Sequence, residues 1–487
     1  MRRWLEKYNS IPVQVKASFW FLICSFLQKG ISTITTPIFT RLLSSGEYGQ
    51  YSVFNSWLDI IAIFVTLRLY YGVFNQGLIK FENDRARYIS SMQGFAFVLS
   101  AGWTVLYLIF HCFWNRLFGL STVQMLAMML MIWTTSVFRF WAAEQRFSYK
   151  YRALVVISIV VSIAKPLIGI FLVIHAEDKV TARILGLALV EVIGYTGLFC
   201  IHMHRGKQFC SAQYWKHALL FNLPLLPHYL SQTVLNSSDR IMIQRMVSEE
   251  AAGIYSLAYS ISNIMTLFTQ SLNQTLTPWM LKKIKTNRVN EISGIVYPSL
   301  AGIAIVNLLL ISFAPEVVRL FAPKSYYDAI WVIPPVAMSV YFSFTYNLFS
   351  CFEFYFEKTH YTMIASICGA ILNILLNYIF IQIYGYLAAG YTTLICYIVY
   401  AVCHYLMMRR ICNEHMDEVQ AYDPKKLFMI SGIFLLGGFL LLFTYLLPFI
   451  RYLLIAVIAG LIIFYRKKIV FSLSLFLKMR QQNKENT

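Results

Sequence analysis

Charged residues are scarce in this chain. Only 13% of its 487 residues are Asp, Glu, Lys or Arg, whereas a soluble domain carries about 25%. Acidic residues are the scarcest, with 22 Asp and Glu against 41 Lys and Arg. Together with the 58% of hydrophobic residues, this composition excludes an ordinary soluble domain and indicates a protein embedded in a lipid bilayer.

Several motifs of soluble enzymes and pumps are also missing. The nine cysteines form no CxxC pair and no Cys/His spacing typical of a metal site. The sequence has neither a GxxxxGK[ST] phosphate loop nor an Asp-x-Asp motif, and no connection between its apolar runs exceeds about 20 residues. These absences exclude an ATP-driven motor on this chain, argue against a sugar-nucleotide-dependent enzyme and predict no cofactor.

Long apolar runs make up most of the sequence. Residues 359–408 contain no Asp, Glu, Lys or Arg, and about 20 residues are enough for a helix to cross the hydrocarbon core. We therefore predict an all-α polytopic membrane protein with about fourteen transmembrane helices. The predicted spans are 15–38, 51–73, 88–110, 121–143, 153–174, 183–203, 217–239, 253–279, 292–314, 329–351, 360–383, 386–408, 427–447 and 450–468.

Basic residues are distributed unevenly between the connections. With the N-terminus in the cytoplasm, the segments on that side hold 28 Lys and Arg, and the opposite side holds 9. This asymmetry follows the positive-inside rule and predicts that both termini are cytoplasmic. The first apolar run is long and lacks a small-residue cleavage pattern, so we expect a retained signal anchor rather than a cleaved signal peptide.

A twelve-residue segment occurs twice in the chain, 204 residues apart. RLLSSGEYGQYS at 41–52 and RMVSEEAAGIYS at 245–256 share five identities without a gap. Six predicted helices separate the copies, so both lie on the same side of the membrane, as in transporters built from two parallel repeats. Gly49 and Gly253 would suit a turn with positive φ at this position.

The surroundings of the two copies resemble a known family. PIFTRLLSSGEYGQYSVF in the first half and FNLPLLPHYLSQTVLNSSDRIMIQRM in the second are similar to the half-signatures of polysaccharide transport proteins. These are the Wzx-type flippases of the multidrug/oligosaccharidyl-lipid/polysaccharide exporter superfamily. The resemblance implies two six-helix lobes, 1–210 and 211–410, beside a central cavity. Residues 411–487 would add a linker, two helices and a basic cytoplasmic tail.

The same resemblance implies an activity. Such proteins flip an undecaprenyl-diphosphate-linked oligosaccharide from the cytoplasmic to the outer leaflet of the bacterial inner membrane, for O-antigen, capsule or exopolysaccharide synthesis. It also implies two partner proteins, a polysaccharide polymerase and a chain-length regulator.

Six Asp, Glu, Lys and Arg residues lie inside the predicted spans at least four residues from either end, and all six belong to the first half of the chain. Such residues are costly in lipid and usually face a cavity or a partner. Counted from the inner helix ends at 1.5 Å per residue, four of them lie near the midplane and two arginines lie nearer the cytoplasm. The midplane residues are Lys29, Asp59, Lys165 and Glu191, and the arginines are Arg68 and Arg139.

The four cations predict a cavity for an anionic substrate. Arg68 and Arg139 would receive the pyrophosphate at the cytoplasmic mouth, because a guanidinium matches phosphate geometry. Lys29 and Lys165 would hold it midway. Two other interpretations remain open at this point. The arginines could extend to lipid headgroups, and the midplane residues could form the structural pairs Lys29–Asp59 and Lys165–Glu191. Asp59 or Glu191 could also couple transport to a proton gradient.

Polar and proline positions supply further candidates. Pro224 and Pro227 are the best hinge candidates, because two breaks within one turn weaken a helix most. The candidates for contact with sugar are Gln28, Gln232, Asn236, Gln270 and Asn273, with Asn373 and Asn377 as further polar positions. Interhelical hydrogen bonding is the alternative role for all of them.

Three competing functions remain. A multidrug exporter of the same superfamily should carry uncompensated acids in its cavity, whereas the balance here is basic. Sequence alone distinguishes a lipid II-type flippase from a polysaccharide flippase only by resemblance to one family or the other. A membrane polysaccharide polymerase, the alternative from another class, would expose a large external loop that this chain lacks, so we predict a protein that is not an enzyme.

Overall fold

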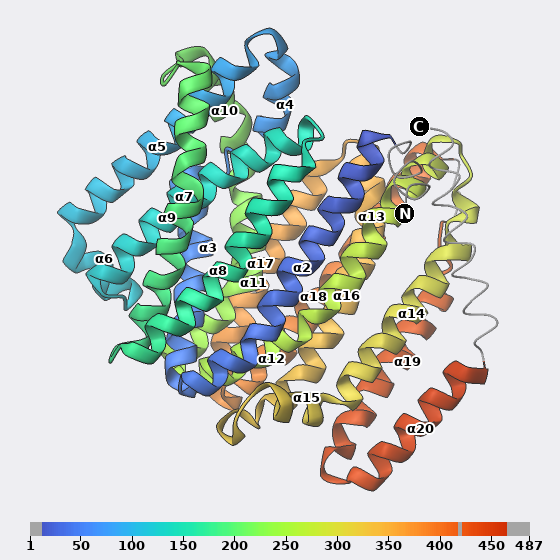
Figure 1. Ribbon diagram of the computed structural model, residues 1–487. Helices are drawn as coiled ribbons and strands as arrows, with labels where there is room; N and C mark the ends of the chain where they lie inside the picture. Colours follow the sequence, from blue (N-terminus) through green and yellow to red (C-terminus); the bar gives the residue numbers. More distant parts are fainter. Residues whose placement is uncertain (1–11, 417–420, 465–487) are drawn as a thin grey trace, which may run out of the picture. The chain divides into compact units, whose positions relative to one another are not determined.

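The computed structural model describes residues 12–416 and 421–464 (Figure 1). Within these ranges the regular secondary structure is entirely helical. Ten described helices are long and apolar enough to cross a membrane, or eleven if the bent pair Lys324–Trp331 and Ile333–Tyr355 counts as one span. The predicted all-α, multi-span architecture is therefore confirmed. The basic residues Arg2, Arg3 and Lys7 and the predicted basic tail lie outside the described residues.

The chain divides into two compact units, Met1–Ser237 and Ser238–Thr487, with the boundary inside α11. The helices that begin in the first unit are α2 (Val13–Leu42), α3 (Ser45–Thr66), α4 (Gly72–Lys80), α5 (Arg85–Ile109), α6 (His111–Phe118), α7 (Thr122–Phe147), α8 (Tyr151–His175), α9 (Lys179–Gly206), α10 (Ala212–Asn222) and α11 (Leu226–Met246). Helix α9 packs against α5, α7 and α8, and α2 packs against α8.

The second unit is built around α16. Its helices after α11 are α12 (Glu249–Ser262), α13 (Ile264–Lys285), α14 (Ser293–Ser312), α15 (Ala314–Phe321), α16 (Ala329–Tyr355), α17 (Thr359–Tyr384), α18 (Leu387–His415), α19 (Pro424–Phe443) and α20 (Pro448–Phe464). Helix α16 packs against α12, α13, α14 and α18. Each of the first thirteen predicted spans corresponds to helical structure, and so does the fourteenth over 450–464, while its last four residues lie outside the described residues.

The repeated segment has the same local structure in both copies. α2 ends at Leu42 and α11 at Met246, and a serine then caps the next helix. Ser44 Oγ accepts a hydrogen bond from the Glu47 N–H at 3.2 Å, and Ser248 Oγ accepts one from the Ala251 N–H at 3.1 Å. These caps satisfy N–H groups that a helix leaves free at its start.

The prediction that Gly49 and Gly253 form a turn with positive φ is wrong. Gly49 lies inside α3 and Gly253 inside α12, and both are buried. The serine caps make the turn in both copies, so neither glycine needs a positive φ.

Two predicted spans have different limits in the structure, for identifiable reasons. The span 51–73 ends at Thr66, because Leu67 and Arg68 adopt positive φ angles of 48° and 49°. The span 253–279 remains part of one candidate membrane span, Glu249–Lys285, but α12 ends at Ser262 and α13 begins at Ile264 within it. Ser260 and Ser262 donate hydrogen bonds to the carbonyl oxygens four residues back, both at 2.8 Å, and this bonding bends helices.

Close packing in the first unit depends on two glycines. A Cβ atom on Gly186 of α9 would lie 3.1 Å from the Cα atom of Gly169 in α8. The two backbones can therefore approach closely, as small residues allow in membrane helix pairs. This contact fixes the spacing of the two helices that carry Lys165 and Glu191.

Candidate functional site

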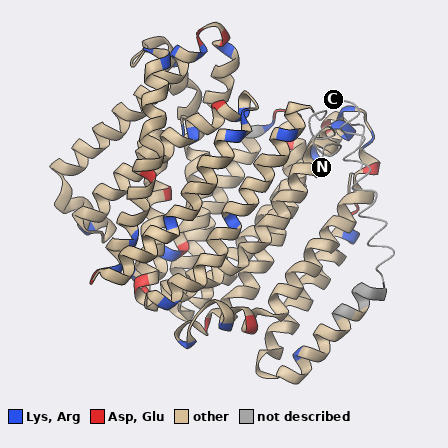
Figure 2. Ribbon diagram, viewed as in Figure 1, with Lys and Arg blue, Asp and Glu red and all other residues tan. Residues whose placement is uncertain are grey.

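Charged residues gather at the helix ends and in the connections, and few lie along the long helices (Figure 2). The exceptions in the first unit include Lys29 on α2, Arg139 on α7 and Lys165 on α8, whereas Arg68 lies in the break between α3 and α4. Because a charge in hydrocarbon is costly, each of these residues must meet water, a partner or a ligand. Their contacts distinguish the neutralised cations from those open to a ligand.

The break after α3 places Arg68. The Thr66 hydroxyl accepts a hydrogen bond from the Arg68 N–H at 3.2 Å, and the Asn222 side chain donates to the Leu67 carbonyl at 2.7 Å. These contacts satisfy the Arg68 N–H and the Leu67 carbonyl, two backbone groups that have no partner within the helix where it ends. The Arg68 guanidinium donates to the Thr233 hydroxyl at 3.2 Å and lies 5.1 Å from the centroid of the Tyr229 ring.

Arg139 contacts the same break from α7. Its Nη1 donates to the Tyr70 hydroxyl at 2.9 Å, and its guanidinium lies 4.8 Å from the centroid of the Tyr70 ring. The side chain is otherwise exposed. Tyr70 lies two residues after Arg68, so both predicted arginines border one short segment between α3 and α4. Within the part of the chain that the structure describes, neither arginine has a carboxylate partner.

Lys165 has a different environment. Its Nζ lies 2.6 Å from Oε1 of Glu191, and the Oε2 atom of Glu191 accepts hydrogen bonds from Thr135 at 2.9 Å and Thr134 at 3.3 Å. The Glu191 side chain is only 5% exposed, whereas that of Lys165 is 29% exposed. The two charges neutralise each other between α8 and α9. Lys165 is therefore a weaker candidate for phosphate binding than the two arginines.

The remaining charged candidates lie on α2 and α3. Lys29 is half-buried on α2, and Asp59 is exposed on α3. A direct pair between them stays a prediction.

The polar candidates for sugar contact differ in exposure. Gln28, Gln232 and Asn273 are half-buried, and Asn236 and Gln270 are exposed. Asn236 donates to the Gln232 carbonyl at 2.8 Å. In contrast, Asn373 and Asn377 are fully buried, so they are closed to a sugar in this conformation.

The hinge candidates Pro224 and Pro227 lie where the chain changes from an α-helix to a 3₁₀ turn and back. α10 ends at Asn222, a single 3₁₀ turn covers Leu223–Leu225, and α11 begins at Leu226. Pro224 lies in the 3₁₀ turn and Pro227 in the first turn of α11. Proline is tolerated there because its missing N–H would have no intrahelical partner. The predicted single span 217–239 is thus interrupted, and a hinge motion at this point stays a prediction.

A buried carboxylate in the second unit escaped the sequence analysis. Asp239 on α11 is 1% exposed. It accepts hydrogen bonds from Asn377 at 2.6 Å, Tyr255 at 2.7 Å and Thr393 at 2.8 Å. These donors join α11 to α12, α17 and α18 and satisfy the carboxylate. The only sequence signal was the spacing of Asn373 and Asn377, which places both on one face of a helix.

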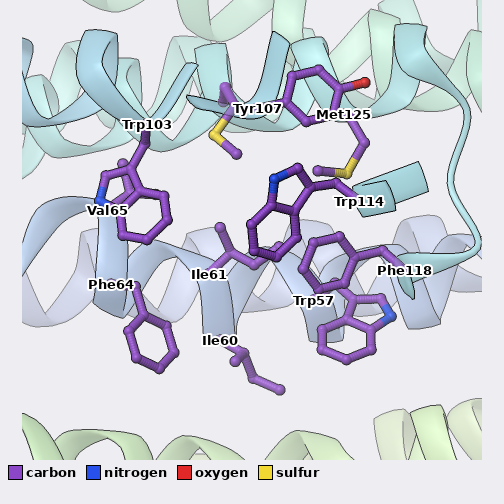
Figure 3. A pocket seen from close by; sticks show the side chains of 11 residues that line it. Trp57, Ile60, Ile61, Phe64, Val65, Trp103, Tyr107, Trp114, Phe118 and Met125 are labelled. Carbon is purple, nitrogen blue, oxygen red and sulfur yellow. The ribbon is translucent and has the colours of Figure 1, made fainter. Parts of the chain in front are cut away.

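An apolar pocket lies in the first unit (Figure 3). It has a volume of about 290 Å³ and lies among α3, α5, α6 and α7. Its lining is almost entirely hydrophobic and mainly aromatic: Trp57, Ile60, Ile61, Phe64, Val65, Trp103, Tyr107, Trp114, Phe118, Met125 and Met129. Such a surface suits a hydrocarbon chain rather than a sugar or a phosphate.

Known proteins match both the sequence and the fold. The family described as "Polysaccharide biosynthesis protein" matches residues 15–284, and the family described as MatE matches residues 224–379. A protein of the Lsg locus of Haemophilus influenzae is 22% identical over 285 residues, which cover 56% of this chain and 67% of that protein.

Two solved transporters share the fold at low sequence identity. The lipid II flippase MurJ in its inward closed conformation has a TM-score of 0.64 and 15% identity, over 92% of this chain and 99% of that one. An inward-facing multidrug resistance MATE family transporter has a TM-score of 0.61 and 14% identity, over 79% and 95%. Its superfamily is the multidrug/oligosaccharidyl-lipid/polysaccharide exporters named above. The chain thus belongs to the polysaccharide biosynthesis protein family and has the fold of this transporter superfamily.

Proposed function

We propose that this protein flips an undecaprenyl-diphosphate-linked oligosaccharide from the cytoplasmic to the outer leaflet of the bacterial inner membrane. The family is one of polysaccharide biosynthesis, and proteins of this fold are transporters or flippases. The lipid-linked substrate, the membrane and the cytoplasmic position of both termini are parts of this proposal. A polymerase and a chain-length regulator are its proposed protein partners.

The observation that carries the proposal is the state of Arg68 and Arg139. Both border the segment between α3 and α4, and their partners are hydroxyl groups and aromatic rings rather than carboxylates. Their positive charge is therefore not neutralised. Guanidinium groups bind phosphate oxygens bidentately, so two of them near one segment suit a diphosphate.

Other features of the first unit support the same substrate class. The aromatic pocket offers an apolar surface for part of an isoprenoid chain. Lys29 would add positive charge, and Lys165 with Glu191 would limit how tightly the anion is held. The half-buried and exposed amides named above would contact the sugar, and the Pro224 and Pro227 turn would act as the hinge for alternating access.

The test is flipping of a fluorescent undecaprenyl-diphosphate oligosaccharide in proteoliposomes. We expect Arg139→Gln and Arg68→Gln each to lower the rate roughly 10- to 100-fold, because charge-assisted hydrogen bonds contribute about 1.5–3 kcal/mol. Arg319→Gln is the matched control. Arg319 donates to the Tyr327 hydroxyl at 3.2 Å and lies 5.4 Å from the centroid of its ring, but it belongs to α15.

The outcomes separate the competing functions. Equal rates for the Arg139 and Arg319 variants would exclude a role of Arg139 in substrate binding. Transport of a lipid-linked peptidoglycan precursor in preference to the oligosaccharide would favour a lipid II-type flippase. Efflux of cationic drugs without transport of any lipid-linked sugar would contradict the proposal as a whole.

A further inference from the structure

A second buried acid in the second unit is paired with histidine. Glu353 of α16 is fully buried, and its Oε1 lies 2.6 Å from Nδ1 of His404 in α18. The other oxygen accepts a hydrogen bond from the Thr362 hydroxyl of α17 at 2.7 Å. The Nε2 atom of His404 is buried and has no hydrogen-bond partner among the described residues. Three helices thus meet at one acid, and among the residues that the structure describes its only ionisable hydrogen-bond partner is an imidazole.

The surroundings of the pair supply no compensating charge. α16 places the Tyr346 ring 5.3 Å from the imidazole centroid, and α18 places the Tyr400 ring at 5.0 Å. These tyrosines are the titratable groups that face the pair, and α17 contributes Thr362. In the described part of the chain, Glu353 forms no ion pair with Lys or Arg.

The number of protons on the pair decides its net charge. With a neutral imidazole and an ionised Glu353, the site carries one negative charge in a dry environment, which is costly. One additional proton, on either group, makes the net charge zero. The closed packing of α16, α17 and α18 therefore favours the state with this proton bound. Loss of the proton favours a conformation that admits water.

The first unit contains a corresponding pair with different neighbours. Glu144 of α7 lies 2.9 Å from Nε2 of His202 in α9. α7 and α16 contain the fourth predicted span of their halves, and α9 and α18 contain the sixth. This copy has Arg205 at 4.0 Å from Glu144. Its net charge is therefore already balanced.

The histidine in the first unit is also held in one tautomer. Gln93 Nε2 donates to the Val137 carbonyl at 3.2 Å and lies 3.0 Å from Nδ1 of His202. A carbonyl oxygen only accepts, so the amide nitrogen of Gln93 must face it, and the same NH₂ group donates to Nδ1. His202 is thereby a neutral imidazole whose Nε2–H donates to Glu144.

From this contrast we propose that the Glu353–His404 pair is a proton-binding site that exchanges one proton each time the second unit changes conformation. The proton comes from water on the side of the membrane that holds Lys358, which the charge distribution predicts to be cytoplasmic. It adds to the pair and changes its charge from −1 to zero. Transport is then linked to pH on that side. The linkage rests on the proposed transport function, whereas the site itself does not.

The first experiment measures transport in proteoliposomes while the pH is varied on one side at a time, between 5 and 8, where histidine ordinarily changes charge. A single linked proton changes the rate by up to about tenfold per pH unit. We expect this dependence in the wild type and in Glu144→Gln, and a flat profile in Glu353→Gln and His404→Gln. A wild-type profile in both of the last two variants would overturn the proposal.

A second measurement needs no transport. Infrared difference spectra of the purified protein after a pH jump should show a carboxyl band of Glu353 or an imidazole band of His404, which Glu353→Gln or His404→Gln removes and Glu144→Gln retains. Bands that persist unchanged in both folded Glu353→Gln and folded His404→Gln would reject the site. If no lipid-linked oligosaccharide is transported by any variant, the proposed function fails, and the infrared result still decides whether this pair binds a proton.

Discussion

Aromatic rings, rather than carboxylates, hold several of the arginines of the first unit. Arg68 lies over Tyr229 and Arg139 over Tyr70, and the buried Arg183 lies 3.5 Å from the centroid of the Tyr51 ring. A ring fixes a guanidinium without cancelling its charge. An arginine held in this way can be buried or oriented and still attract an anion.

The charge of Lys165, by contrast, is neutralised by a carboxylate, that of Glu191. We expect Lys165→Met to lower the free energy of unfolding by about 2–3 kcal/mol, because it leaves a buried carboxylate without its cation. This figure is below the usual cost for fully buried pairs, since the Lys165 side chain is 29% exposed. The measurement is denaturant unfolding in detergent.

Two further variants control this prediction. Lys165→Met combined with Glu191→Gln should recover most of the stability, because it removes the unpaired charge. Lys216→Met, at an exposed lysine of α10, should have almost no effect. A Lys165→Met protein as stable as the Lys216→Met protein would show that the pair contributes nothing.

At the scale of helices, the serine caps in the two copies of the repeated segment should stabilise the protein to the same extent. Ser44→Ala and Ser248→Ala should each cost about 1 kcal/mol of stability, because each removes the acceptor at a helix start. Thermal unfolding of the purified variants measures this. Ser45→Ala, at the first residue of α3, is the control. Equal melting temperatures for the Ser44 and Ser45 variants would contradict a stabilising cap.

The same scale shows what the sequence could predict of the fold. The long spans were predictable because about 20 apolar residues in succession have few alternatives to a membrane helix. The end of α3 at Thr66 was not, because it depends on the side chain of Asn222, 155 residues away. The short helices α4, α6 and α15 were missed, since helices of eight or nine residues lack the length of a span.

The candidate site was predictable to a smaller extent. The contact between Lys165 and Glu191 was predictable, because the two residues lie at the same expected membrane depth in neighbouring predicted helices. Asp239 was missed because its three donors come from α12, α17 and α18, which no local pattern connects. The Glu353–His404 pair was missed for the same reason, since neither residue lies in a recognisable motif.

For the whole molecule, two exposed cysteines can test the predicted orientation. Cys112 lies on α6 and Cys210 lies just before α10, and the charge distribution places them on opposite sides of the membrane. In variants that retain one cysteine each, a membrane-impermeant maleimide should label Cys112 in intact spheroplasts. It should label Cys210 only after the membrane is opened. The reverse pattern would invert the topology, and labelling of both in intact spheroplasts would contradict it.

The aromatic pocket has one more consequence. Trp57, Trp103 and Trp114 all line it, and the chain has only ten tryptophans. Nearly a third of the indole fluorophores therefore surround a single cavity of the first unit. The emission of the unlabelled protein thus contains a built-in optical signal from the place where we expect a hydrocarbon chain to lie.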